Sequence, residues 1–187
     1  GGFVRYWPGI DTRIIHRMAA IRDVQAALHQ DRIEAFYQPV YCLTSRRIIA
    51  LEALCRLRMA GGGVLAAAAF REATSDVQIA SELTGRMLDI VARDIHDWSR
   101  AGVVLDHVGL NVSLADFHGG KLHDQIAAAA ARDSGLLSQL VIEVTEGAYP
   151  VLRDPAVTSQ LDSLRARGLR TALDDFGTSG GMLMTLL

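Results

Sequence analysis

Alternating strand-like and helical segments predict an α/β fold with a mainly parallel sheet. Apolar runs at 107–112, 140–145 and 170–173 are each followed by a helical pattern, at 121–132, 154–167 and from about 179. Short links between such alternating segments are typical of parallel β/α units. Two earlier strand-like segments, 33–41 and 48–57, are joined by a polar link around residues 44–47. That link is too short for a parallel crossover, so we expect these two strands to be antiparallel.

Helical patterns precede and follow this first strand pair. Apolar residues recur at helical spacing from Ile14 to Leu28, with Asp11 as the expected cap, and predict a linker helix within residues 1–31. A second helical region follows Gly61–Gly63, is broken near Ser75, and resumes to about Arg100. A (β/α)₈ TIM barrel needs eight strands and typically about 250 residues, so we expect this chain to supply about the first five strands of one. An open, doubly wound five-stranded sheet is the alternative.

Composition limits the classes of function. The 187 residues are 50% hydrophobic and 21% charged, which predicts one globular domain with a sizeable core. A formal net charge of -2 gives no basic field for DNA binding, so an anionic ligand must be held by a few arginines or by a metal. No apolar run approaches the roughly 20 residues of a membrane span, and we expect a cytoplasmic location for this segment.

Polar residues follow four of the predicted strands. They are Glu52, Asn111, Glu143 and the pair Asp174 and Asp175. Ligands of parallel α/β folds bind at the carboxyl ends of strands, so these side chains are expected to converge. An all-oxygen site suits Mg²⁺, Mn²⁺ or Ca²⁺, and the adjacent aspartates allow a second ion. Taken alone, Asn111 or Asp174 is equally explained as the cap of the next helix.

Five sequence blocks in a fixed order point to a family. They are Tyr37-Gln38-Pro39, Glu52-Ala53-Leu54-Cys55-Arg56, Asn111-Val112-Ser113, Glu143-Val144-Thr145-Glu146 and Asp174-Asp175-Phe176-Gly177-Thr178. This set resembles the EAL domain of bacterial cyclic di-GMP phosphodiesterases. The resemblance implies a modified TIM barrel with an antiparallel first strand pair. It assigns residues 32–187 to an EAL-type domain whose C-terminal part is expected to be missing.

The resemblance also implies roles for individual residues. The expected ligands of a Mg²⁺ or Mn²⁺ ion are Glu52, Asn111, Glu143 and Asp174, with Asp175 bridging towards a second ion. The expected substrate contacts are Gln38, Leu54 and Arg56, the last through a phosphate. Glu52, Asp174 and Asp175 are the expected catalytic residues. The implied reaction is metal-dependent hydrolysis of the second messenger cyclic di-GMP to 5′-pGpG.

Departures from the family pattern leave alternatives open. The family carries a lysine on its next strand and further glutamates beyond it, and the single lysine here, Lys121, lies at the start of an earlier helix. A catalytically inactive EAL-like module that binds cyclic di-GMP or a protein partner is therefore an alternative, as is a remnant that acts through protein contacts. The resemblance also allows a homodimer and, in a longer parent protein, GGDEF or sensor domains as partners.

Overall fold

The computed structural model describes residues 8–118, 120–145 and 153–174. Its sheet runs in the order β1, β2, β4, β5, β6, with the short β3 paired to β2. The strands are β1 (Ile33–Tyr41), β2 (Ile48–Arg58), β3 (Val64–Ala66), β4 (His107–Val112), β5 (Leu140–Thr145) and β6 (Arg170–Asp174). The helix expected from about residue 179 lies outside the described residues.

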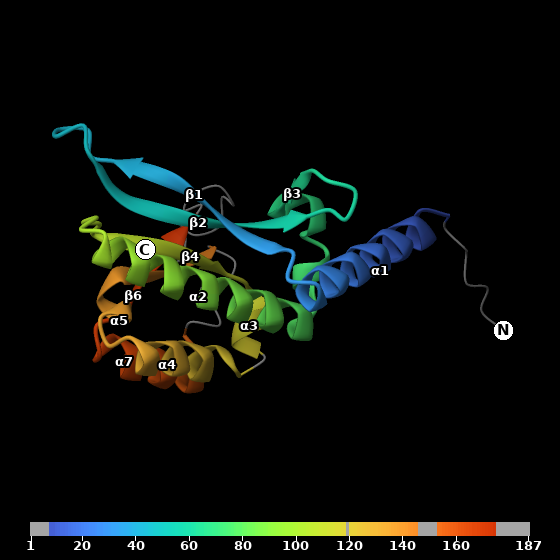
Figure 1. The fold of residues 1–187 in the computed structure, drawn as a ribbon. Helices are drawn as coiled ribbons and strands as arrows, with labels where there is room; N and C mark the ends of the chain where they lie inside the picture. The colour runs from blue at the N-terminus through green and yellow to red at the C-terminus, as the bar shows by residue number, and fades with distance from the viewer. Residues whose placement is uncertain (1–7, 119, 146–152, 175–187) are drawn as a thin grey trace.

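Strand pairing confirms the predicted topology. β1 and β2 are antiparallel, and β2, β4, β5 and β6 are parallel neighbours in chain order. A doubly wound sheet reverses its strand order partway and carries helices on both faces. Among the described strands the order does not reverse, and α2, α4 and α7 all lie on one side of the sheet (Figure 1). The architecture is that of a partial barrel, which excludes the open-sheet alternative.

The longer helices are α1 (Pro8–His29), α2 (Val77–Arg100), α4 (Leu122–Arg132) and α7 (Pro155–Arg165), with the short α3 (Leu114–His118) and α5 (Leu136–Gln139) between them. Of these, α2, α4 and α7 cover that single face, whereas α1 projects from the body of the domain (Figure 1). Asp76 begins α2 by accepting hydrogen bonds from the backbone of Gln78 and Ile79. Such a cap satisfies backbone donors that have no partner within the helix. Among the helices described here, none is both long and apolar enough to span a bilayer.

Two local predictions are wrong. Residues 64–66, expected to be helical, form β3, which pairs antiparallel with β2, and 3₁₀ turns follow at 67–70 and 73–75. Gly62 and Gly63 have φ of 90° and 83°, a backbone region that favours glycine, and so reverse the chain into this extra strand. The first helix begins at Pro8, three residues before Asp11, so Asp11 does not cap it.

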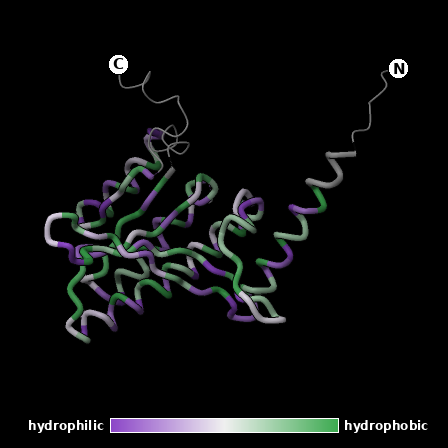
Figure 2. The backbone as a smooth tube through the Cα atoms, turned by 90° about the horizontal axis from the view of Figure 1, so that it is seen from above, coloured by the Kyte–Doolittle hydropathy of each residue, from purple (hydrophilic) through white to green (hydrophobic). Residues whose placement is uncertain are grey.

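The core lies between the sheet and the helices. Val108, Leu110 and Val112 of β4 alternate with Gly109 and Asn111 and are buried in one cluster with the apolar side of α2. Ile142 in β5 is fully buried in the same cluster. Burying each large apolar side chain contributes about 1.5–3 kcal/mol. Figure 2 shows hydrophobic and hydrophilic residues alternating along the helices, and α1 projecting from the body.

Candidate active site

Strand register brings the predicted metal ligands onto one face of the sheet. Glu52 is paired with Gly109, and Asn111 with Glu143. Glu143 is in turn paired with Ala172, two residues before Asp174. Paired residues point to the same side of a sheet, and side chains alternate along a strand. All four predicted ligands therefore lie on the face opposite the helices, which is the inner face of a barrel.

Glu52 and Asn111 are in direct contact across β2 and β4. The side-chain amide of Asn111 donates a hydrogen bond to Oε1 of Glu52 at 2.8 Å. Asn111 is therefore not the cap of the next helix. That role belongs to Ser113 and Asp116, because the backbone N–H and the hydroxyl of Ser113 donate to Oδ2 of Asp116 at 2.7 and 2.6 Å.

Glu143 experiences the charge of its neighbours. Burial, together with the negative charges of Glu52 and Asp174, raises the pKa of Glu143 to about 7. Like charges that lie this close disfavour ionisation, and a cation would relieve the repulsion. The Glu143 side chain also covers Gly109, where a Cβ atom would collide with its carboxylate. The strand ends thus concentrate negative charge on one small area.

The donor set fits a hard divalent cation in its chemistry, since it consists of carboxylate and amide oxygens. The described side chains do not form a ready-made coordination shell: within the described ranges no group of three or more His, Cys, Asp or Glu residues is placed to hold a metal ion. Asp175, the expected bridging ligand, lies outside those ranges.

The predicted substrate contacts lie on the same inner face. Gln38 in β1 pairs with Glu52, and Phe36 pairs with Leu54. The Arg56 guanidinium lies over the ring of Phe36, 5.7 Å from its centroid, and donates to the carbonyl of Cys55 at 3.0 Å. Aromatic rings attract such cations and limit their motion. Sequence reasoning missed Phe36, although its position two residues before Gln38 on a predicted strand places both on one face.

A pocket of about 370 Å³ is lined by Leu54 but not by Gln38, Phe36 or Arg56, and it lies largely between the helix-facing side of β2 and β4 and helix α2. Leu54 and Asn111 line one wall, and Phe70, Leu83 and Met87 contribute an apolar wall from the 67–70 turn and α2. Ligand pockets are mostly apolar with a few placed polar groups, and this one has that character. The sequence did not predict it, because its apolar wall comes from the 67–70 turn and α2, segments that gave only a helical pattern.

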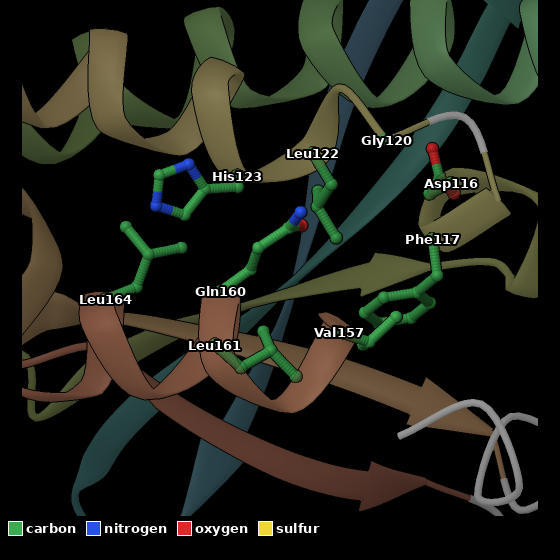
Figure 3. Close-up of a pocket in the computed structure, with 9 residues that line it drawn as sticks. All are labelled: Asp116, Phe117, Gly120, Leu122, His123, Val157, Gln160, Leu161 and Leu164. Atoms are coloured by element: carbon green, nitrogen blue, oxygen red, sulfur yellow. The ribbon is translucent and has the colours of Figure 1, made fainter. Parts of the chain in front are cut away.

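A second pocket, shown in Figure 3, lies among α3, α4 and α7, and none of the predicted site residues lines it. Its volume of about 10 Å³ is enough for about one water molecule. His123 beside it contacts Asp124 at 3.1 Å and the Ser163 hydroxyl at 2.9 Å. The Ser163 hydroxyl donates to the carbonyl of Gln160 at 2.9 Å, so the His123 ring donates to Ser163 instead of taking its proton. This contact joins α4 to α7 and is not a nucleophile activated by a base.

Strands that follow one another in chain order, with acidic residues on one shared face, define a barrel-type α/β domain with an oxygen-rich site. The chain belongs to the EAL domain family, whose model matches residues 21–187. The match begins inside α1. The predicted family is thereby confirmed, and so is the predicted fold.

Relatives with assigned names support the same family. The chain is 25% identical over 186 residues to the bifunctional diguanylate cyclase/cyclic di-GMP phosphodiesterase MucR of Pseudomonas aeruginosa, covering 99% of this chain and 27% of MucR. It is 28% identical over 164 residues to the cyclic di-GMP phosphodiesterase NbdA of the same organism, covering 88% of this chain and 21% of NbdA.

A solved structure of the MucR phosphodiesterase in complex with c-di-GMP has a TM-score of 0.76 and 27% identity, covering 86% of this chain and 64% of that one. Compared with the full-length MucR and NbdA proteins, the chain spans about a quarter of their length.

Proposed function

We propose that this chain carries the β1–β6 part of an EAL-type phosphodiesterase that hydrolyses cyclic di-GMP to 5′-pGpG with Mg²⁺ or Mn²⁺. The observation that carries the proposal is the register of β2, β4, β5 and β6, which sets Glu52, Asn111, Glu143 and Asp174 on one face. The names of MucR and NbdA supply the substrate and the reaction. A cytoplasmic location, where the substrate is a signalling molecule, belongs to the same proposal.

Each of the predicted metal ligands has a role in this proposal. Glu52, Asn111, Glu143 and Asp174 would hold the divalent ion, and Asp175 would hold a second. When bound, the ion supplies Lewis-acid stabilisation of the charge that develops on the phosphodiester. Asn111 fixes the Glu52 carboxylate through its amide, so one ligand is oriented before any ion arrives. In the hydrolysis, the oxygen of water forms a bond to phosphorus, the bond between phosphorus and the 3′ oxygen of one ribose breaks, and that oxygen takes up a proton from the water.

Substrate binding is assigned to the neighbouring inner-face residues. The planar Arg56 guanidinium matches two phosphate oxygens, and its contact with Phe36 limits its orientations. Gln38 offers an amide beside Glu52. The apolar pocket lined by Leu54 and Asn111 is proposed to take a flat base of the same nucleotide. These features fit a nucleotide better than an inorganic phosphate.

A second candidate is a module that binds cyclic di-GMP or a protein partner without hydrolysis. It is favoured by the lack of a preformed group of three metal-binding side chains in the described part of the chain. Under either candidate, a second copy of the chain, or GGDEF or sensor domains of a longer parent protein, would act as partners in regulation. The two candidates differ in whether metal and turnover accompany binding.

The test is to incubate the 187-residue chain with cyclic di-GMP and Mg²⁺ or Mn²⁺, separate products by chromatography, and measure nucleotide binding in EDTA. Metal-dependent formation of 5′-pGpG supports the phosphodiesterase. Tight binding in EDTA with no product at any metal concentration supports the binding module. The absence of both binding and product would contradict the phosphodiesterase and the cyclic di-GMP-binding module, and would leave only a module that binds a protein partner.

A further inference from the structure

The backbone conformation of residue 109 in β4 does not require a glycine. Its φ is not positive, unlike that of Gly62 or Gly63, so the strand conformation accepts any residue. Glycine within a strand costs conformational entropy and packs no side chain. The reason for a glycine at this position therefore has to come from what lies over it.

The Glu143 carboxylate occupies the space that a side chain at residue 109 would fill. A Cβ built on Gly109 would lie 2.5 Å from the carboxyl carbon of Glu143 and 2.9 Å from Oε2, with Oε1 closer still. Carbon atoms that are not bonded make their best contacts at about 3.5–4.0 Å, so both groups cannot be present in these positions.

The sheet register explains why this position matters. Gly109 is the β4 partner of Glu52, whereas Glu143 is paired with Asn111, two residues further along β4. Glu143 therefore reaches back diagonally along β4 to place its carboxylate over the residue beside Glu52. A side chain on residue 109 would stand between the two carboxylates.

We infer that Gly109 is a positioning residue, whose missing side chain lets the Glu143 carboxylate lie beside Glu52. The inference rests on the proposed function in that the two carboxylates are taken to share a divalent ion. Gly109 itself offers no ligand and touches no substrate. It acts through Glu143.

The substitution Gly109→Ala separates this role from folding. The atoms in collision belong to the end of a flexible side chain, so the carboxylate moves while the strand stays in place. Alanine is at least as compatible with a strand as glycine. We expect the urea midpoint of the metal-free variant to equal or exceed that of the parent chain. We expect its affinity for Mn²⁺, measured by titration calorimetry, to fall about tenfold or more, as when other supports of a metal ligand are lost.

Two comparisons show whether the effect passes through Glu143. Gly85→Ala is the matched control, because a Cβ there would also displace the end of a long side chain, the amide of Gln125, but away from the acidic group. It should leave the Mn²⁺ affinity unchanged. In a Glu143→Gln background, Gly109→Ala should change the affinity by less than about twofold, since the group it displaces no longer supplies a charged ligand. An equal loss in both backgrounds would overturn the inference.

A crystal structure of metal-free Gly109→Ala gives a readout that does not depend on any ion. The Glu143 carboxylate should be displaced from its position over β4, and an unmoved carboxylate would overturn the inference even if affinity changed. If the parent chain bound no Mn²⁺ while the carboxylate moved as expected, the proposed metal site would fail and the positioning of Glu143 by Gly109 would stand.

Discussion

Replacing Glu143 by glutamine should stabilise the metal-free chain at neutral pH. Folded Glu143 has a pKa of about 7 against an ordinary value of 4.5. The folded state therefore holds this proton to a higher pH than the unfolded state does. Stability then falls as pH rises from about 4.5 to about 7, and the full penalty is present above that window. Glutamine resembles the protonated acid in shape and carries no charge, so it should avoid the penalty.

The size of the effect follows from the same pKa values. At about 1.4 kcal/mol for each tenfold change in proton affinity, the difference between 4.5 and about 7 sets an upper bound of roughly 3 kcal/mol. Glu143 is only half-buried, and solvent screens charges at such positions. We therefore expect the free energy of unfolding of Glu143→Gln to exceed that of the parent chain by about 1 kcal/mol at pH 7.5. Near pH 4 the two free energies of unfolding should be equal.

The assay is urea unfolding followed by circular dichroism in EDTA at pH 4, 6 and 7.5. Glu72→Gln is the control, because Glu72 is exposed and lies outside the acidic group. It should show no pH-dependent difference from the parent chain. A Glu143→Gln stability difference that is the same at all three pH values, or a parent chain more stable than the variant at pH 7.5, would refute the reasoning.

Two further predictions concern the core and the substrate contacts. Ile142→Ala removes a fully buried side chain of β5 and should lower the free energy of unfolding by about 2–5 kcal/mol in the same urea assay; a loss below about 1 kcal/mol would show that the core is not packed as described. Arg56→Ala should weaken cyclic di-GMP binding about tenfold or more in calorimetry while Mn²⁺ affinity stays the same, because only a phosphate contact is lost. Unchanged nucleotide affinity would remove Arg56 from the site.

The strand order and the inner-face residues were predictable because they follow from alternation. In β4, Val108, Leu110 and Val112 are apolar and buried, which leaves Gly109 and Asn111 for the other face. The same rule placed Glu143 in β5 opposite the buried Ile142 and Val144. The alternation of apolar and polar residues along each strand was therefore enough to predict the sheet and the side chains that share a face.

Features that depend on contacts between distant segments were not predictable. β3 forms because residues 64–66 pair with the end of β2, and their apolar run alone is equally suited to a helix. The position of the Glu143 side chain over Gly109 depends on the register between β4 and β5. The pocket lined by Leu54 exists only because α2 packs against the sheet and supplies one of its walls. Sequence spacing reports which residues share a face, but not which of them touch.

The most direct test of the account compares cyclic di-GMP turnover by the parent chain and by Glu52→Ala. Both should give the same circular dichroism spectrum, because Glu52 lies on the open inner face and is not part of the buried core. The account predicts Mg²⁺- or Mn²⁺-dependent 5′-pGpG formation by the parent chain, reduced roughly a hundredfold or more in the variant. The exposed control Glu72→Ala should retain full turnover. Equal turnover by the parent chain and Glu52→Ala would contradict the assignment of the acidic residues of the inner face as the catalytic site.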